Sequence, residues 1–432
     1  MNEIYIENFG PVKEARVSLE KQMQLFIGAQ ASGKSTICKV VYFCQKIRDY
    51  TLDFLMDANQ FTYNHENEYY SIYLKYLTRQ FMGCFGKTTH MPRFKITYKF
   101  NDKKVTIQLN RDGYVRFLFD DFLKKSIQGL IDESAKMYLV DLKSKEISSV
   151  LDSMTALAML KKQISARLQK LFENDRDIVY VPAGRSLLAM MSEQLHDFSI
   201  ADMDLTMQEF ITLIRNTKNR FGSKIPDIVK EYTKTVSGQI NNNSLDMAYE
   251  LIHEIFKADY TSETDGEKVY FDDYHWVKLM YSSSGQQEVL WILMLSFIFI
   301  LEKRKCFFIV EEPEAHLFPL AQKKVVDLLA LMSNSTGSSV IITTHSPYIL
   351  TSLNILLYSD KIETRFKGKN GTVIPKSLRL PFEKFAAFKL TGESDSPISL
   401  MDAESHMIDT DYIDEVSSLT NKELEELMEM EG

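Results

Sequence analysis

The sequence contains little cysteine, and its four cysteines show no recognisable pairing. Cys38, Cys44, Cys84 and Cys306 lack the short, repeated spacings of zinc sites and disulfide frameworks. We therefore expect buried thiols in a protein of the reducing cytoplasm. The beginning of the chain has no basic stretch followed by an apolar one, so no signal peptide is expected either.

Long apolar runs are scarce as well. The longest extends from Val289 to Leu301 between Glu288 and Glu302, and its thirteen residues include Ser296. A helix that crosses a bilayer needs about 20 apolar residues. The run therefore predicts a buried helix and no attachment to a membrane.

Positive charge is in short supply only at one end of the chain. From Glu393 onward, 13 acidic residues stand against the single lysine Lys422, a net charge of −12. The whole chain carries −8, so residues 1–392 carry −8 − (−12) = +4, too weak a basic balance to demonstrate nucleic-acid binding. Residues 411–430 combine acids with apolar residues at helical spacing. This pattern suits either a terminal helix packed on its own body or a docking surface that repels DNA or attracts a basic partner.

The length of the chain allows one large domain with insertions, or two to three domains. Its patterns divide it into an N-terminal lobe, helical insertions around a core strand, a C-terminal lobe and an acidic tail: 1–120, 121–260 with the strand at 178–181, 261–392 and 393–432. Residues 157–171 carry leucine and isoleucine at spacings of 3, 4, 4 and 3. That spacing predicts a core-facing stripe or a short helical hairpin rather than a long arm.

The most informative stretch matches the phosphate-binding pattern G-x-x-x-x-G-K-[ST]. It consists of Gly28, Ala29, Gln30, Ala31, Ser32, Gly33, Lys34, Ser35 and Thr36. Residues 24–27 predict a strand before it and residues 37–47 a helix after it, which is the context that such a loop requires. Its backbone N–H groups and the helix N-terminus would face phosphate oxygens. Lys34 would reach the β- and γ-phosphates and Ser35 would bind Mg²⁺; the alternative is a chance match in a glycine-containing turn.

Two further strands end in polar residues. The apolar strand 306–310 is followed by Glu311 and Glu312. Downstream of a phosphate loop, this pattern predicts that Glu311 holds Mg²⁺, directly or through water, and that Glu312 polarises the water that attacks the γ-phosphate. Acids also end strands for solubility alone. The strand 340–344 is followed by His345, which can hydrogen-bond the γ-phosphate, although a histidine in this place is often satisfied by a neighbour.

Residues 283–288, with the sequence Ser-Ser-Gly-Gln-Gln-Glu, open the apolar helix and stand shortly before the paired acids. Serines at a helix start cap it and leave backbone amides free. Arg185 follows the strand 178–181 in a Pro-Ala-Gly-Arg turn. It could contact phosphate or a partner subunit, or it could be a surface arginine in a tight turn.

Along the chain, the phosphate loop comes first, then residues 283–288, then the paired acids Glu311 and Glu312, and last His345. Motifs in this order resemble those of the ABC-fold ATPases of the SMC and OLD (overcoming-lysogenization-defect) type. More narrowly, the chain is similar to the stand-alone AAA-family ATPases of bacterial anti-phage modules such as Septu and PARIS. The residues that carry the resemblance are 6–11, 28–36, 180–186, 283–288, 311–317 and 344–347. The resemblance implies an α/β fold: an ABC-type ATPase head with a mixed β-sheet and helical insertions.

The resemblance also implies that ATP and Mg²⁺ are bound between two copies, in a homodimer or a higher oligomer. The phosphates would be held in one copy by Gly28, Gln30, Ala31, Ser32, Gly33, Lys34, Ser35 and Thr36. The other copy would cap the γ-phosphate with Ser284, Gly285 and Gln287, and Arg185 is a further candidate. His316 is an interface candidate. Gln286 stands where the family has a second glycine and Glu311 where it has aspartate, which leaves the hydrolysis rate open.

The function that the resemblance implies is an ATPase that controls a separate effector, a nuclease or toxin, after a phage-derived trigger. The TOPRIM nuclease domain of OLD proteins has no counterpart after His345. Two alternatives stay open: an SMC-like repair ATPase that clamps DNA, and a nucleotide-locked scaffold with little turnover. A transporter ATPase is disfavoured because about 250 residues separate the phosphate loop from residues 283–288.

Overall fold

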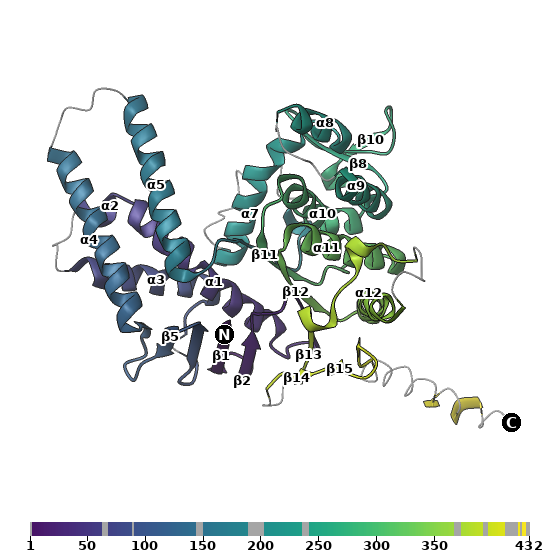
Figure 1. Cartoon of the computed structure of the whole chain (residues 1–432), viewed down its shortest axis with the longest axis horizontal. Helices are drawn as coiled ribbons and strands as arrows, with labels where there is room; N and C mark the ends of the chain where they lie inside the picture. Colours follow the sequence, from purple (N-terminus) through teal and green to yellow (C-terminus); the bar gives the residue numbers. More distant parts are fainter. Residues whose placement is uncertain are drawn as a thin grey trace.

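The computed structural model describes most of the chain (Figure 1). The described residues are 2–62, 68–88, 90–143, 150–188, 203–235, 242–366, 373–391, 396–410, 422–423 and 426–428. Most of the acidic segment 411–430, for which the sequence predicts a helix, lies outside them.

A six-stranded sheet forms the centre of the molecule, in the order β14-β13-β3-β12-β11-β7. Its strands are β3 (Met23–Gly28), β7 (Asp177–Val181), β11 (Cys306–Glu311), β12 (Ser339–Thr344), β13 (Phe385–Leu390) and β14 (Ile398–Ser399). All pairs are parallel except β13–β14, which is antiparallel. This arrangement confirms the predicted α/β fold with a mixed sheet.

The central sheet separates two hydrophobic cores, because alternate residues of its strands point to opposite faces. Phe26 and Ile309 belong to the core under α1 (Lys34–Met56). Leu25 and Val310, their chain neighbours, belong to the core on the other face. That face is covered by α9 (Asn242–Phe256), α10 (Ser284–Glu302), α11 (Pro319–Thr336) and α12 (Pro347–Phe366).

Helix α10 is apolar on every side and fills the second core. By length and composition alone it could cross a membrane, but 89% of its apolar window is buried inside the protein. A helix that is hydrophobic all round is expected in a protein core as well as in a bilayer. The sequence prediction of a buried helix is therefore confirmed, and all four cysteines are buried too.

A second, five-stranded sheet lies beside α1 in the order β2-β1-β4-β5-β6, with every pair antiparallel. Its strands are β1 (Asn2–Phe9), β2 (Val12–Ser18), β4 (Lys95–Phe100), β5 (Lys103–Leu109) and β6 (Val115–Phe119). The short α2 (Asn59–Thr62) and the longer α3 (Tyr69–Phe85) follow α1 along the chain. Phe81 of α3 contacts both Phe43 of α1 and Phe117 of β6, so these three elements share one aromatic core.

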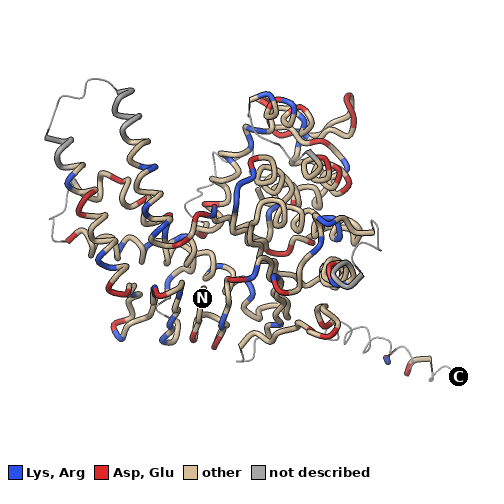
Figure 2. The backbone as a smooth tube through the Cα atoms, viewed as in Figure 1, with Lys and Arg blue, Asp and Glu red and all other residues tan. Residues whose placement is uncertain are grey.

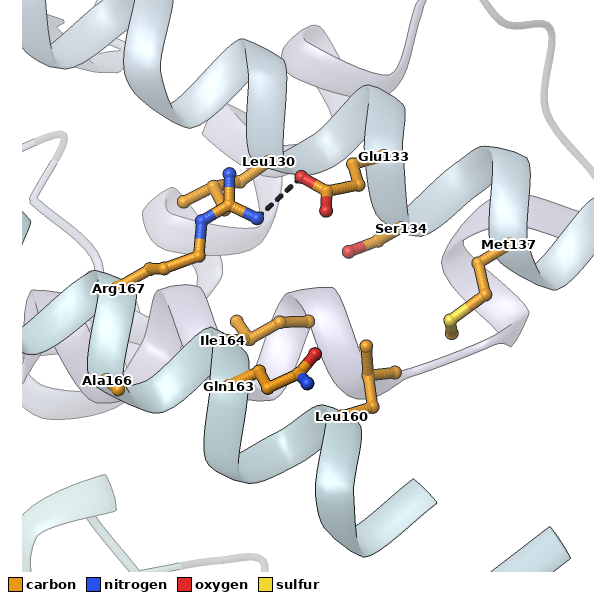
Figure 3. A pocket seen from close by; sticks show the side chains of 9 residues that line it. All are labelled: Leu130, Glu133, Ser134, Met137, Leu160, Gln163, Ile164, Ala166 and Arg167. Carbon is orange, nitrogen blue, oxygen red and sulfur yellow. Dashed lines mark hydrogen bonds and ion pairs between the residues drawn. The ribbon is translucent and has the colours of Figure 1, made fainter. Parts of the chain in front are cut away.

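Helices α4 (Asp121–Lys143) and α5 (Val150–Phe172) form a hairpin that projects from this lobe (Figure 1). Along the predicted stripe of α5, Ile164 and Leu168 are buried but Leu157 is exposed. A space of about 600 Å³ opens between the two helices, and the Glu133–Arg167 ion pair bridges it at 2.6 Å (Figure 3). The stripe is thus core-facing at the base of the hairpin only.

Further helices, strands and turns complete the described part of the chain. They are α7 (Leu205–Lys218), α8 (Ile225–Thr235), β8 (Asp259–Glu263), β9 (Gly266–Tyr270), β10 (Trp276–Lys278), β15 (Met401–Asp402), β16 (Met407–Ile408) and 3₁₀ turns at Asn219–Phe221, Leu279–Tyr281, Lys376–Leu378 and Phe382–Lys384. Strands β8, β9 and β10 form a small antiparallel sheet. Acidic and basic residues are interspersed along the chain (Figure 2).

The contact between β3 and β13 predicts a strict requirement for glycine at position 28. A Cβ atom on Gly28 would clash with the carbonyl oxygen of Leu390 on β13. We expect Gly28→Ala to lower the free energy of unfolding by about 1–3 kcal/mol, as overpacking does. Gly129→Ala in α4, where the new methyl group meets open space, should instead be neutral or stabilising by about 0.5–1 kcal/mol. Urea unfolding of the two variants checks this; equal shifts would contradict it.

Candidate functional site

The glycine-rich loop connects the end of β3 to the start of α1, as its sequence predicts. Gly33 is the N-cap of α1, with a left-handed φ of 96°, and no side chain caps the helix there. The first backbone N–H groups of α1 are therefore left for another acceptor. Amides of this kind at a helix N-terminus form a binding site for phosphate oxygens.

Lys34 is the first residue of α1 and its side chain is buried inside the loop. The ammonium group donates hydrogen bonds to the carbonyl oxygens of Gly28 and Ala29, each at 2.9 Å. Burial lowers the pKa of Lys34, and the nearby carboxylates of Glu312, Glu311 and Glu314 oppose that shift. The Lys34 ammonium and these three carboxylates, at the end of β11 and in the turn after it, therefore lie close enough to attract one another.

The strand order explains why residues far apart in sequence meet here. Strand β12 lies between β3 and β11, with Thr344 beside Ile27 and Thr343 beside Glu311. Because the three strands are parallel, their carboxyl ends lie at the same edge of the sheet. Ligand sites of open α/β sheets form at this edge.

Glu311 is buried at the end of β11. Its Oε2 accepts a long hydrogen bond of 3.4 Å from the backbone N–H of Ala183, and its buried Oε1 has no partner among the described residues. An unpaired buried carboxylate oxygen is costly unless a cation or donor satisfies it. The hydroxyl of Ser35, the second residue of α1, is exposed, and with this carboxylate it offers oxygen ligands of the kind that Mg²⁺ prefers.

Glu312 and His345 face each other at the mouth of the site. Glu312 Oε1 lies 3.7 Å from His345 Nε2, and both side chains are about two-fifths exposed. Glu312 has a left-handed φ of 44°, a strained conformation for this residue, and its N–H donates to the Thr343 carbonyl at 3.0 Å. The strained turn directs a carboxylate to the open edge of the sheet while its neighbour Glu311 stays buried.

Glu314 is a site residue that the sequence analysis missed. Its Oε1 accepts hydrogen bonds from the Thr344 hydroxyl at 2.6 Å and from the His345 N–H at 2.9 Å, so it fixes the turn that carries the histidine. Burial raises the pKa of Glu314, its hydrogen bonds oppose the shift, and the charge of Glu312 adds to it. The only sequence signal was a third acid two positions after Glu312.

Arg185 is buried, so the surface-arginine alternative is wrong. Its guanidinium donates to four backbone carbonyl oxygens, and each of them belongs to a segment of the site. They are Pro182 at 2.7 Å, Glu288 at 2.8 Å, Glu311 at 2.6 Å and Glu312 at 3.0 Å. With these acceptors around it, the guanidinium holds the turn after β11 in place.

Glu288 completes this arrangement from α10. Its carboxylate accepts from the backbone N–H groups of Arg185 and Ser186, each at 3.0 Å, and lies 3.4 Å from Arg185 Nε. Both side chains of the pair are almost fully buried. The pair therefore joins β7, β11 and α10 at one point.

The first turn of α10 presents the predicted serine and glycine. Ser283 is the N-cap and forms a capping box with Gln286, which explains a glutamine where the family has glycine. Ser284 is exposed, and Gly285 packs so closely on the turn after β11 that a Cβ would lie 2.7 Å from the His316 carbonyl oxygen. The Gln287 amide is buried and donates to three carbonyls of residues 279–282. These hydrogen bonds of Gln287 stabilise the turn at residues 279–282, which precedes α10.

The buried ion pair of Arg185 and Glu288 predicts that substitution of Arg185 lowers the stability of the fold. Arg185→Lys keeps the charge but cannot reach four carbonyls with a planar fork of donors. We expect a loss of about 1–3 kcal/mol in the free energy of unfolding, because buried carbonyl oxygens lose their donors. The exposed pair Arg167–Glu133 gives the control: Arg167→Lys should change stability by less than about 0.5 kcal/mol. Denaturant unfolding measures both, and similar small losses would refute the role of the buried pair.

A family model described as "AAA ATPase domain" matches residues 1–350. No curated protein matches the chain in sequence.

Among solved structures, similar ones include an Smc head bound to the C-winged helix domain of ScpA (12% identity, TM-score 0.40, 93% of this chain and 98% of that one). A second is the Smc head domain with an extended coiled coil bound to the C-terminal domain of ScpA from Pyrococcus furiosus (12%, 0.37, 92% and 95%). A third is the SMC head domain from Thermotoga maritima (11%, 0.32, 81% and 90%).

Proposed function

The chain belongs to the AAA ATPase domain family, and on this premise we propose that it hydrolyses ATP with Mg²⁺ at a site completed by a second copy. The observation that carries the proposal is the meeting of Lys34, Glu311, Glu312 and His345 at the carboxyl ends of neighbouring strands. Phosphoryl transfer uses a cation that binds phosphate, oxygen ligands for Mg²⁺ and a group that orients water, and these four side chains could supply those groups from distant parts of the sequence.

The residues have distinct roles in this proposal. The loop amides and the Lys34 ammonium bind the β- and γ-phosphate oxygens. The Ser35 hydroxyl and the Glu311 carboxylate hold Mg²⁺, which when bound neutralises phosphate charge. Glu312 accepts the proton of the attacking water and His345 donates a hydrogen bond to the γ-phosphate. Gln30, Ala31, Ser32 and Thr36 shape the loop around the phosphates.

Exposed apolar side chains support assembly of two copies around the nucleotide. Tyr281 precedes the serines of α10, Phe318 and Leu320 follow the turn after β11, and Tyr348 follows His345; all four are more than half exposed. Exposed apolar residues that gather beside a functional edge mark interaction surfaces. A second copy seated there would bring its own Ser284 and Gly285 to the γ-phosphate, with His316 at the contact.

We propose further that the assembled ATPase controls a separate effector, a nuclease or toxin, in a cytoplasmic anti-phage system. The support is the set of motifs shared with stand-alone ATPases of such systems. In this proposal a phage-derived trigger changes the nucleotide-dependent association of the chain. Co-purification with the products of neighbouring genes tests it: recovery of a nuclease or toxin supports the proposal, and recovery of chromosome-associated proteins instead contradicts it.

Binding and hydrolysis should separate in two variants. Lys34→Ala removes the charge that faces the phosphates and should abolish ATP binding. Glu312→Gln should keep binding but lower kcat by about 10²–10⁴, the usual contribution of a general base. Calorimetry and phosphate release measure the two quantities, with Glu383→Gln at an exposed 3₁₀ turn as the control. Hydrolysis at the wild-type rate by Glu312→Gln would show that this carboxylate is not the base.

Sharing of the site between copies predicts complementation. Ser284→Arg should spare nucleotide binding yet block turnover, because bulk and charge would occupy the partner's γ-phosphate position. Mixing it with Lys34→Ala should restore activity, since each mixed dimer has one intact composite site. Mass spectrometry first shows that mixed dimers form. If they form and no ratio of the two variants recovers turnover, the site is not shared.

A further inference from the structure

A groove of about 840 Å³ lies between α3 and β6, outside the nucleotide site. One wall is the outer side of α3 and the other is the last strand of the five-stranded sheet. The lining includes Lys75, Arg79, Met82, Tyr114, Arg116 and Leu118. On its inner side α3 packs on α1 through Phe81 and Phe43, so the groove is one helix away from the helix that begins with Lys34.

The strand wall of the groove is an open sheet edge. Strand β6 pairs with β5 on one side, and no other described strand pairs with its outer side. An edge strand offers a row of unpaired N–H and C=O groups to an extended segment. A groove beside such a strand can also bind an amphipathic helix through its apolar face, and this mode suits the helical spacing of residues 411–430.

The groove is basic. Lys75 and Arg79 lie one turn apart on the exposed side of α3 and form no ion pair within the described residues. Arg116 projects from β6, and its Asp112 neighbour lies 3.7 Å away in an exposed pair. Exposed pairs of this kind hold their partners weakly. The occupant should therefore bring negative charge.

Apolar side chains stand between these cations. Tyr114, Leu118 and Met82 are 72%, 49% and 40% exposed. Leu118 lies two positions after Arg116 on β6, and Tyr114 lies two positions before Arg116, immediately ahead of the strand, so the three side chains give an apolar-basic-apolar sequence along this wall. Exposed apolar residues gathered in a groove indicate a binding surface, here for a segment that mixes acidic and apolar residues.

We propose that this groove binds the acidic carboxyl-terminal segment, residues 409–432, of a second copy of the chain. The segment has nine acids against Lys422, and apolar residues are spread among the acids. Leu427 and Met428, both described, are 62% exposed. The charge and the apolar content of the segment both match those of the groove, and the attraction between them weakens as salt rises.

The place where the segment begins favours a second copy over the same chain. Ile408 exchanges two hydrogen bonds with the Asn354 side chain on α12, which anchors the start of the segment in the C-terminal lobe. Figure 1 shows α12 and the described pieces of the segment on the opposite side of the molecule from α3. The segment of one chain thus begins across the molecule from the groove of that same chain.

Photo-crosslinking of the full chain tests the proposal. Tyr114→p-benzoylphenylalanine places the crosslinker on an exposed position of the groove, and ¹⁴N- and ¹⁵N-labelled protein are mixed without nucleotide. We expect crosslinks from position 114 to residues 409–432 that join chains of different isotope content. Lys75→Glu with Arg79→Glu should lower their yield by about ten-fold, because like charges then meet across the contact. The control Lys161→Glu with Lys162→Glu, on exposed positions of α5, should leave the yield unchanged.

Several results would overturn the proposal. Crosslinks confined to one isotope would place the segment in its own chain, and crosslinks to another region would assign a different occupant. If Lys75→Glu with Arg79→Glu leaves the crosslinks intact but weakens the fluorescence anisotropy response of a labelled single-stranded oligonucleotide, the groove is a nucleic-acid surface. Because nucleotide is absent throughout, these outcomes are independent of the shared ATP site.

Discussion

The buried pair of Arg185 and Glu288 is the contact on which the geometry of the nucleotide site depends. The guanidinium binds carbonyl oxygens of Glu311 and Glu312, while the carboxylate binds backbone amides after β7. A buried charge needs such complete hydrogen bonding, because an unpaired charge in a protein interior is strongly destabilising. The contact therefore fixes the turn that aims Glu312 and, through Glu288, the first turn of α10.

This contact also connects the two halves of the proposed reaction. Ser284 and Gly285, which would contact the nucleotide of another copy, stand on the helix that carries Glu288. Glu312, which would act on this copy's own nucleotide, stands on the turn held by Arg185. A displacement of α10 on closure of two copies would thus reach the catalytic turn through a short chain of buried, satisfied hydrogen bonds.

Local patterns predicted much of the fold and of the site. The apolar runs of β3, β11 and β12, the glycine loop and the acids after β11 are signals that neighbouring residues carry. Arg185 could not be placed in this way, because its partner Glu288 is 103 positions away. Glu314 was missed since its role depends on Thr344 and His345 of the next strand. Gln287 looked like a nucleotide contact, yet its amide supports the turn of residues 279–282.

In the proposed function, Lys34 of one copy and Ser284 of another bind the same nucleotide. A structure of the Glu312→Gln variant with ATP and Mg²⁺ tests it most directly. We expect two copies, with each γ-phosphate held by Lys34 of one copy and by Ser284 and Gly285 of the other. A nucleotide contacted by a single chain, with Ser284 left in solvent, would show that the site is not shared.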